Sequence, residues 1–525
     1  MGNLTFATWA QTVTPQPESS FFASNFLLII STIILASVVW YVISAAIAWQ
    51  RLGRFPGPTQ AKFSYLWGFF AISSGRMHHI LAKEQPKYGK IMRIGPNELL
   101  IYDPDTIWQI NGVRSTYTRG GWYSSIQFDP YGHSVLSEPD TTKHDKRKAI
   151  IGGGYAGKGN VNIEKKIDSL LAILVNTLKT KYLKKGAQNI VDFGLLIRYF
   201  QVDIVTLVGC GEAWGDLANE TDHFDFISIA DRYVPFLQCF MMVPFLRNFF
   251  ASKFFLTLAG PKPTDEKGMG KFLQIIKGIV EGRFGDGPSE SSGQQMAMLD
   301  EWMKHGLSRR ECELELAIQL PAGVETSSTV IRGTLLYLLS APNVYLNLQR
   351  EITAGIRDGR ISSPITQDEA RKLPYLQAVI YEGLRMVPAA LTGFPKKVPA
   401  GGDNICGEFV PEGTEIFLNL WCMLRNKKVF GEDADMFRPA RFLECDEMKK
   451  AQLMKNVDLA FGHGRWMCPG KTLAWFELNK IFVELLRHFD FQIVNPECPW
   501  SCRGYASFMI DDFWIRVMER SSYEL

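Results

Sequence analysis

The sequence predicts a mainly α-helical domain with a smaller β part, preceded by one N-terminal transmembrane helix. Seven segments with apolar residues at helical spacing and two strand-like regions predict the domain. A long uncharged stretch near the N-terminus predicts the membrane helix. With 525 residues, 46% of them hydrophobic and 21% charged, the chain can bury a large core, which excludes a disordered or collagen-like protein. The 57 Lys and Arg nearly balance the 54 Asp and Glu without a long basic run, so no nucleic-acid partner is expected.

The first sixty residues divide into three segments: a lumenal tail at 1–20, a transmembrane anchor at 21–50 and a proline-rich hinge at 51–60. As a helix, residues 26–49 would span about 36 Å, which exceeds the ~30 Å hydrocarbon core of a bilayer. Only Glu18 precedes this span and the basic residues follow it, which predicts a lumenal N-terminus and a cytosolic domain. We therefore expect a single-pass protein of the endoplasmic reticulum membrane, with Asn3 of Asn3-Leu4-Thr5 as a lumenal glycosylation acceptor.

The rest of the chain alternates predicted helices with a few strands. Apolar residues recur at helical spacing in 163–185, 192–211, 268–284, 309–340, 342–357, 366–386 and 471–488. Short strands are expected at 91–94 and 98–101 around the turn Gly95-Pro96-Asn97, and in pieces of 398–417. The Gly- and Ser-rich residues 285–295 predict a surface loop.

One of the nine cysteines stands apart from the others. The odd count and the absence of a CxxC pair argue against a disulfide scaffold or a zinc ribbon. Cys468, however, lies in Phe461-Gly462-His463-Gly464-Arg465-Trp466-Met467-Cys468-Pro469-Gly470, just before a predicted helix. Glycines let backbone approach a flat ligand, and a helix N-terminus stabilises a thiolate, which is a soft ligand for haem iron.

This loop closely resembles the haem-binding loop FxxGxRxCxG of the cytochrome P450 monooxygenases. The resemblance implies haem b with an axial thiolate from Cys468 as the metal ligand, and cofactor contacts from Phe461, Gly464, Arg465, Trp466 and Gly470. One position departs from the family pattern, because Trp466 stands where the family has an arginine and Arg465 lies one residue earlier. A tryptophan can offer a haem propionate only its indole N–H.

Two further motifs follow in the family's order. Glu382-Gly383-Leu384-Arg385 resembles the helix motif ExxR, although such a pair alone usually decorates a surface. The segment 437–442 resembles the later loop that supplies a second arginine. The resemblance implies that Glu382, Arg385 and Arg441 form a buried ionic lock with a structural role.

The predicted helix 309–340 contains a fourth match, Ala322-Gly323-Val324-Glu325-Thr326, which resembles the family's distal-haem segment. By resemblance, Ala322 and Gly323 make room beside the haem, while Glu325 and Thr326 are the catalytic residues that relay protons. Pro321 removes one helical hydrogen bond and should deepen a kink. Weaker matches suggest His144, Arg147 and Lys396 as propionate partners, with an ordinary surface charge as the alternative for each.

The resemblance covers about residues 55–525 and implies one haem-thiolate catalytic domain at 61–525. The family inserts one oxygen atom of dioxygen into an organic substrate. Because no GxGxxG of the chain follows a predicted strand, as a flavin or nicotinamide fingerprint would, the resemblance implies a separate membrane-bound NADPH-dependent reductase as electron donor. Candidates for its docking face are Arg465, Lys471, Lys427 and Lys428.

Several short segments of the sequence resemble those of fungal microsomal members of the family, which modify natural products. By analogy with family topology, the substrate pocket is lined by 115–127, 232–249, 317–326, 387–393 and 506–510, which are rich in apolar residues and favour an apolar small molecule. Membrane lipid is expected around the anchor. Two alternatives remain open: a thiolate-haem isomerase or dehydratase that needs no reductase, and a non-catalytic membrane-anchored haem binder.

Overall fold

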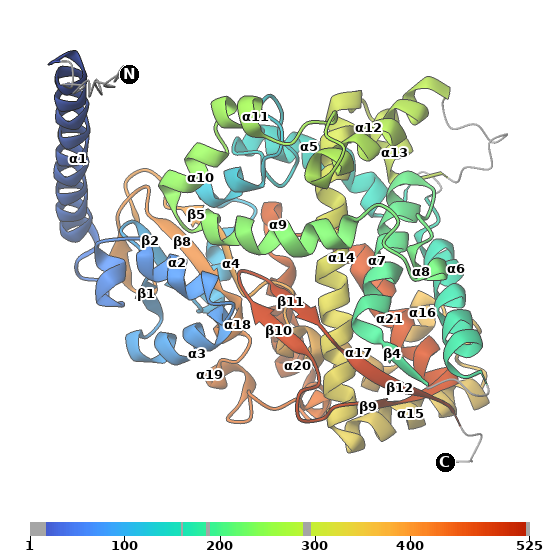
Figure 1. Ribbon diagram of the computed structural model, residues 1–525. Helices are drawn as coiled ribbons and strands as arrows, with labels where there is room; N and C mark the ends of the chain where they lie inside the picture. Colours follow the sequence, from blue (N-terminus) through green and yellow to red (C-terminus); the bar gives the residue numbers. More distant parts are fainter. Residues whose placement is uncertain (1–16, 159–160, 185–188, 287–295, 521–525) are drawn as a thin grey trace, which may run out of the picture.

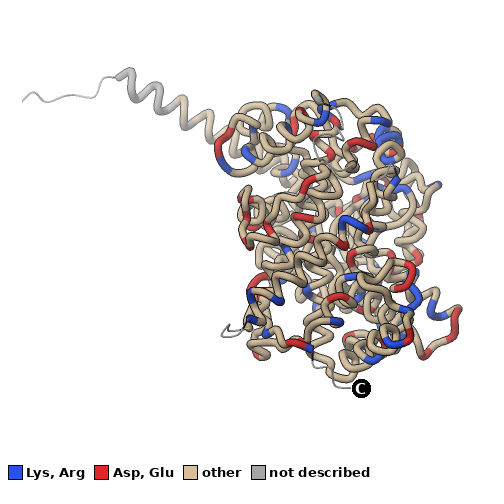
Figure 2. Tube along the Cα trace, turned by 90° about the vertical axis from the view of Figure 1, so that its right-hand side faces the viewer, with Lys and Arg blue, Asp and Glu red and all other residues tan. Residues whose placement is uncertain are grey.

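The computed structural model describes residues 17–158, 161–184, 189–286 and 296–520. Helix α1 (Pro17–Leu52) projects from a large helical body that carries its main sheet on one side, as Figure 1 shows. Lysine, arginine, aspartate and glutamate are interspersed over the visible face of this body in Figure 2. Asn3 and most of the expected loop at 285–295 lie outside the described residues.

The secondary structure is mainly helical with a smaller β part, as predicted. The helices of the body are α2 (Leu66–Ser73), α3 (Met77–Tyr88), α4 (Pro104–Asn111), α5 (Thr141–Tyr155), α6 (Ile163–Thr177), α7 (Phe193–Cys210), α8 (Asp216–Asn219), α9 (Phe226–Met241), α10 (Pro244–Phe250), α11 (Lys253–Ala259), α12 (Gly268–Asp286), α13 (Met298–Lys304), α14 (Arg309–Ser340), α15 (Pro342–Arg357), α16 (Gln367–Ala370), α17 (Pro374–Met386), α18 (Leu420–Met423), α19 (Lys427–Phe430), α20 (Glu447–Asp458) and α21 (Lys471–His488). Short 3₁₀ turns include η2 (Gly121–Ile126), η5 (Pro439–Phe442) and η6 (Leu459–Phe461).

The strands form one five-stranded sheet and three smaller ones. The strands are β1 (Ile91–Arg93), β2 (Glu98–Ile101), β3 (Thr118–Arg119), β4 (Ile190–Asp192), β5 (Thr392–Lys397), β6 (Asp403–Ile405), β7 (Glu408–Val410), β8 (Glu415–Asn419), β9 (Phe489–Ile493), β10 (Ser501–Gly504), β11 (Phe508–Asp511) and β12 (Trp514–Glu519). The large sheet has the order β1-β2-β8-β5-β3, and β4, β12 and β9 form a second sheet. The pair β2–β8 is parallel, whereas β5 runs antiparallel to β8.

Helix α14 is the long central helix of the body (Figure 1). Its N-terminus is fixed by a capping box in which the Ser308 side chain accepts from the Glu311 N–H and the Glu311 side chain accepts from the Ser308 N–H. Most of its residues are buried, and it packs extensively on α7 and α17. The helix continues through Pro321, so the proline is accommodated inside one element rather than ending it.

The predicted membrane anchor lies within α1, and the predicted hinge follows it. The segment Leu28–Leu52 of α1 is a candidate membrane span, because its most apolar 18-residue window has a mean hydropathy of 2.3 and no residue of that window is buried by the rest of the chain. Helix α7 passes the same length and hydropathy test but is a buried core helix. Residues 51–60, expected as a hinge, are packed onto the body, because Leu52 and Phe55 are buried and the Pro56 carbonyl accepts from the Arg93 N–H at 2.7 Å.

Candidate active site

The loop that carries Cys468 connects η6 to α21. The Cys468 N–H donates to the Phe461 carbonyl at 2.7 Å and closes the loop. Gly464 has a φ of +59°, and a Cβ at this position would lie 2.3 Å from the Asn111 carbonyl oxygen, so the loop requires glycine there. Gly470 is the N-cap of α21, and the position that its Cβ would take lies 3.7 Å from the Cys468 Sγ. The loop therefore presents the sulfur at a helix N-terminus, as the sequence predicted.

The Cys468 side chain combines a desolvated thiol with accessible surface. Surrounding protein desolvates the thiol and raises its pKa, while the Gly470 N–H and the charge of Lys148 act in the opposite direction. The residue nevertheless keeps accessible surface. On α14, Ala322 and Thr326 are likewise accessible although most of the helix is buried, and the Thr326 hydroxyl donates to the Ala322 carbonyl at 2.6 Å.

Trp466 lies between two cations of neighbouring strands. Arg119 of β3 and Lys396 of β5 are paired across the strands, and their charged groups lie 5.0 and 5.3 Å from the Trp466 ring. Neither cation has an ion-pair partner in the part of the chain that the structure describes, and the buried Trp466 Nε1 has no hydrogen-bond acceptor there. Burial, together with Arg119, holds the pKa of Lys396 well below its usual value.

These residues fit a haem. The buried Lys396, the half-buried Arg119 and the orphaned Trp466 N–H would all be stabilised by carboxylates, and a haem carries two propionates. Arg119 was not predicted as a cofactor residue, because its short strand becomes significant only through pairing with β5. Arg465 is turned to other partners, with Nη2 donating to the Val113 carbonyl at 2.9 Å and Nε 3.7 Å from Asp145.

Helix α5 supplies one contact to the cysteine loop that the sequence predicted and one that it did not. The buried His144 ring packs on Trp466 with centroids 4.8 Å apart. The Arg147 guanidinium instead pairs with Glu311 at 2.9 Å and Glu315 at 3.4 Å, so the expectation that it serves a propionate does not match its position. The cation that reaches the cysteine loop is Lys148, whose Nζ donates to the carbonyls of Arg465 and Met467. Burial lowers the pKa of Lys148 to about 8.

Glu325 is held in a buried ionic network. Arg198 of α7 donates from Nε to the Glu325 Oε1 at 2.8 Å, and Arg332 lies 3.7 Å from Oε2. Arg198 also forms two hydrogen bonds of 2.6 and 2.9 Å with Asp231 of α9. No local sequence pattern indicates this network, because its members come from three helices far apart in the chain.

Gly323 has a different role from the one expected. A Cβ on it would lie 2.7 Å from the Val205 Cγ2 of α7. Its lack of a side chain therefore allows α7 and α14 to pack closely, whereas Ala322 and Thr326 are the accessible residues of this turn.

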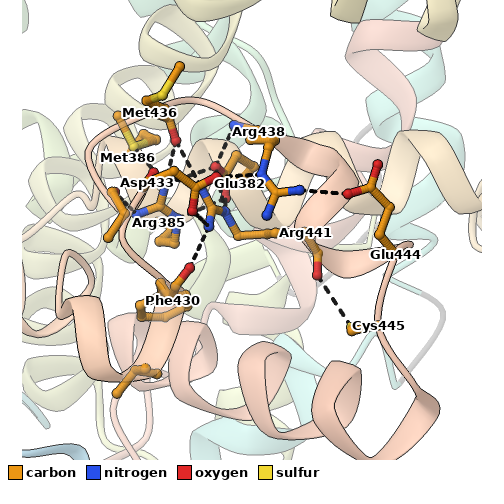
Figure 3. Close-up of polar contacts among 12 residues, drawn as sticks. Glu382, Arg385, Met386, Phe430, Asp433, Met436, Arg438, Arg441, Glu444 and Cys445 are labelled. Carbon is orange, nitrogen blue, oxygen red and sulfur yellow. Dashed lines mark hydrogen bonds and ion pairs between the residues drawn. The ribbon is translucent and has the colours of Figure 1, made fainter.

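Glu382, Arg385 and Arg441 come together in one cluster, as Figure 3 shows. All three are almost fully buried. Arg385 makes hydrogen bonds of 2.7 and 2.8 Å to Glu382, and Arg441 makes bonds of 3.0 and 3.1 Å to the same carboxylate. Other N–H groups of the two arginines donate to backbone carbonyls between Leu424 and Met436, among them that of Phe430, and one donates to the Asp433 carboxylate. The cluster thus fixes this segment to α17.

The five stretches expected around a substrate converge in the structure. One apolar cluster unites residues of η2, α9, α14 and β11: Trp122, Tyr123, Ile126, Met241, Ile318 and Met509. A second one joins Val387 and Leu391 to Phe508 and Ile510, and the Leu391 N–H donates to the Ala506 carbonyl at 2.8 Å. The region beside the accessible turn of α14 is therefore largely apolar.

Comparisons with known proteins agree with this site. The family model described as Cytochrome P450 matches residues 56–510. Cytochrome P450 monooxygenase ABA1 of Pyricularia oryzae is 40% identical over 501 residues, covering 94% of this chain and 97% of the relative. Cytochrome P450 monooxygenase aba1 of Botryotinia fuckeliana is 37% identical over 90% of this chain and 93% of its own length, and pisatin demethylase of Fusarium vanettenii is 27% identical over 89% of each.

Members of this family use haem with a cysteine thiolate ligand and receive electrons from NADPH through a reductase. The match extends over most of the chain, and the cysteine loop, the ionic cluster and the central helix occupy the places that the motifs predicted. The chain belongs to the cytochrome P450 family of monooxygenases.

Proposed function

We propose that Cys468 is the axial ligand of the haem in this monooxygenase and that Arg119, Lys396 and Trp466 receive the propionates. When bound, the haem supplies the activation of dioxygen for insertion of one oxygen atom into the substrate. The observation that carries the proposal is the pair of unpaired cations, buried Lys396 and half-buried Arg119, around the orphaned Trp466 N–H, beside an accessible cysteine. Such a cradle costs stability unless an anionic ligand fills it.

In this proposal, Glu325 and Thr326 relay protons. The Thr326 hydroxyl donates to the Ala322 carbonyl at 2.6 Å, and the residue is accessible. The Glu325 carboxylate is held by Arg198, so it must exchange that partner before it can pass a proton on. The intact acid and alcohol favour oxygen activation over a reaction that needs no reductase.

The first test is a carbon monoxide difference spectrum of reduced membranes that contain the chain. A thiolate-ligated haem gives a red-shifted Soret band, and we expect Cys468→Ala to lose it. The second test measures hydrogen peroxide released per NADPH consumed in the presence of a reductase and without substrate. Reduction of dioxygen to peroxide takes two electrons and two protons, whereas reduction to two waters takes four of each, so impaired proton delivery raises the ratio toward one. Thr326→Ala should raise this ratio, and an unchanged ratio contradicts the proton role.

We infer an apolar small molecule from fungal secondary metabolism as the substrate. The apolar clusters beside α14 support the first part of this inference. The second part is supported by relatives named as fungal monooxygenases and as pisatin demethylase. Binding of candidate terpenoid, polyketide or peptide-derived compounds would be measured as a spectral shift of the haem.

An apolar patch supports the proposed seating on the endoplasmic reticulum membrane with a lumenal N-terminus. The patch consists of exposed side chains of α2, α9, α10 and α11: Phe70, Phe236, Phe245, Phe249, Phe254 and Leu258. Ring contacts connect these helices, for example Phe69 with Phe240 and Phe250 with Phe255. At the base of α1, Trp49 stacks on Phe63, which lies just before α2, the helix that carries Phe70 of the patch. Such a patch is far larger than the scattered apolar residues of a soluble surface.

A basic cavity next to the cysteine loop supports docking of an acidic electron donor. This surface cavity of about 520 Å³ lies between α17, η5, α20 and α21, and its lining includes Arg371, Lys372, Lys450 and Lys471 but no carboxylate. Tyr381 and Trp475, whose ring centroids are 5.0 Å apart, contribute to its apolar floor. An acidic surface with an apolar anchor would complement it.

The expected effect of charge reversal is specific to the partner. Arg371→Glu with Lys372→Glu should raise the reductase concentration needed for half-maximal NADPH consumption severalfold and weaken the salt dependence. The carbon monoxide band should not change, because both side chains are exposed. An unchanged reductase dependence contradicts docking at this cavity.

A further inference from the structure

Residues 231–240 of α9 bury one side chain, and it is polar. Only Gln238 is buried in this stretch, at 7% exposure. Its Oε1 accepts from the Ala506 N–H at 2.7 Å and from the Ser507 N–H at 3.2 Å, and its Nε2 donates to the Ser507 Oγ at 2.8 Å. One amide of α9 therefore makes three hydrogen bonds to the turn between β10 and β11.

The same turn is also anchored to the segment before β5. The Ala506 carbonyl accepts from the Leu391 N–H at 2.8 Å, and Ala390 and Ser507 form an isolated antiparallel bridge. The backbone of the turn is thus held by the body of the protein independently of α9. It provides a fixed point to which Gln238 attaches the helix.

Helix α9 has a weak point just before Gln238. Pro235 lies inside the helix and has no N–H, so it cannot donate to the Asp231 carbonyl four residues earlier. Before the proline, the helix is fixed to α7, because Asp231 forms two hydrogen bonds with Arg198. After the proline, Phe236 is 56% exposed, and the bonds of Gln238 are the only polar contacts described between these last turns and the β10–β11 hairpin.

The contact between Gln238 and the turn lies at the edge of the apolar region beside α14. Met241 at the end of α9, Ala506 and Met509 of the hairpin, and Ile318 of α14 belong to one apolar cluster. In Figure 1, α9 lies alongside β10 and β11. The last turns of α9 and the hairpin are therefore adjoining walls of this region, and Gln238 joins the two walls.

We propose that Gln238 is a positioning residue that holds the last turns of α9 on the turn 505–507 and thereby limits the size of the molecules that reach the haem. The inference rests on the proposed function, because it assigns Gln238 to the substrate side of the same haem site. Gln238 acts through the turn and does not touch the substrate. Without its hydrogen bonds, α9 can bend at Pro235 and move away from the hairpin, which admits bulky apolar molecules more often. A small molecule does not need this movement.

The test uses the full-length holoenzyme in membranes and two probes that bind haem iron through nitrogen, the small imidazole and the bulky triaryl compound clotrimazole. Stopped-flow absorbance of the Soret band gives each association rate constant, which does not depend on the amount of folded protein. Gln238→Leu removes all three hydrogen bonds and should raise the clotrimazole rate constant by about fivefold or more, while that of imidazole stays within about twofold. Ser507→Ala removes one bond and should raise the clotrimazole rate constant about twofold. Gln238→Glu keeps an acceptor for both N–H groups and should stay near the wild-type values.

The control is Gln349→Leu, which removes another buried amide. Gln349 of α15 is 5% exposed and donates to Asp490 of β9, so its loss should lower thermal stability without changing the ratio of the two rate constants.

A clotrimazole rate constant that Gln238→Leu leaves unchanged, or an imidazole rate constant that rises equally, overturns this inference alone. If Gln238→Leu yields no haem protein, Ser507→Ala decides the matter, and an unchanged clotrimazole rate constant overturns the inference. A wild-type protein that gives neither the carbon monoxide band nor a Soret shift with imidazole overturns the proposed function, and the inference with it.

Discussion

At the scale of single residues, Arg119 and Lys396 are the pair whose placement is hardest to explain without a ligand. The two lie on adjacent strands, Lys396 is buried and Arg119 half-buried, and their charges repel. Among the residues that the structure describes, Lys396 has only the Tyr123 hydroxyl at 2.8 Å and the Phe394 carbonyl at 2.9 Å as hydrogen-bond partners. The arrangement favours the haem-bound state over the haem-free state.

We predict that Lys396→Met has opposite effects on the two states. In the haem-free protein, removal of a buried charge should raise the free energy of unfolding by about 1–3 kcal/mol, because methionine fills a similar volume without desolvation cost. In the holoprotein, haem should be lost about tenfold faster, as expected for one weakened ionic contact of about 1.4 kcal/mol. Denaturant unfolding and haem transfer to an acceptor protein measure the two effects. Unchanged haem loss would contradict the propionate role.

Glu98 gives a prediction on pH dependence. It lies opposite Glu415 in the parallel pair β2–β8, and Arg247 at 3.1 Å from Glu415 is the cation between them. Burial and the charge of Glu415 raise the pKa of Glu98 from 4.5 to about 7. The folded state then binds more protons than the unfolded state between those values, so the free energy of unfolding falls as pH rises from about 4.5 to about 7.

Glu98→Gln removes this penalty, since its amide oxygen can still accept from the Asn97 N–H and its NH2 group can donate to the Tyr65 hydroxyl oxygen. At pH 8 the variant should be more stable than wild type by about 2 kcal/mol, which corresponds to a few degrees in Tm. At pH 5 the difference should be small, because Glu98 is then mostly protonated in the folded wild-type protein. Thermal unfolding at the two pH values is the measurement. An equal shift at both would show that Glu98 is ionised throughout.

Which site residues the sequence could reveal depends on the range of their contacts. Cys468, Thr326 and Glu382 were found because each belongs to a short motif with fixed spacing. Arg119 and Arg198 were not found, since each gains its role from a partner more than a hundred residues away. Lys148 was not predicted because it lies in a run of basic residues, and only the packing decides which of their side chains reaches the cysteine loop.

At the scale of elements, the sequence predicted helices with continuous periodicity and missed strands that pair over long distances. Helices α7, α14, α15 and α21 lie within a residue or two of the predicted ranges. The predicted range 366–386 consists of two helices, α16 and α17, with a break just before Pro374. Because the residue before a proline disfavours the helical conformation, this break has a local signal in the sequence. Strand β12 pairs with β4, more than 300 residues earlier, so no local pattern revealed either strand's place in a sheet.

The cluster of Glu382, Arg385 and Arg441 ties α17 to η5, and its loss belongs to this scale. Glu382→Gln leaves two buried guanidinium groups without a full counter-charge, which should cost about 3–5 kcal/mol and reduce the fraction of protein that binds haem. Glu444→Gln is the matched control, because Glu444 is 65% exposed and pairs with Arg438 at 2.6 Å in the same view. This control should lower the free energy of unfolding by less than about 1 kcal/mol relative to wild type. Equal effects of the two variants would contradict a structural lock.

At the scale of the whole molecule, α1 is joined firmly to the body at its base. The Arg93 Nη2 donates to the carbonyls of Ala48 at 3.0 Å and Lys62 at 3.1 Å, and Leu52 is buried. A chain that begins at residue 45 therefore removes most of the candidate span but keeps these contacts. This shortened chain separates the two membrane contacts, since it retains the apolar patch on α10 and α11.

We predict that the shortened chain still binds phospholipid vesicles. The exposed Phe245, Phe254 and Leu258 are 73%, 71% and 68% accessible, and burying each in the interfacial region gains about 1–2 kcal/mol. Replacing all three with serine should lower the vesicle-bound fraction at least tenfold in a sedimentation assay, while Tm stays unchanged because none of them packs in the core. Binding should persist in high salt, since apolar contact is not screened. Binding that salt abolishes, or that the serine variant retains, would show that charge and not the patch holds the body to the membrane.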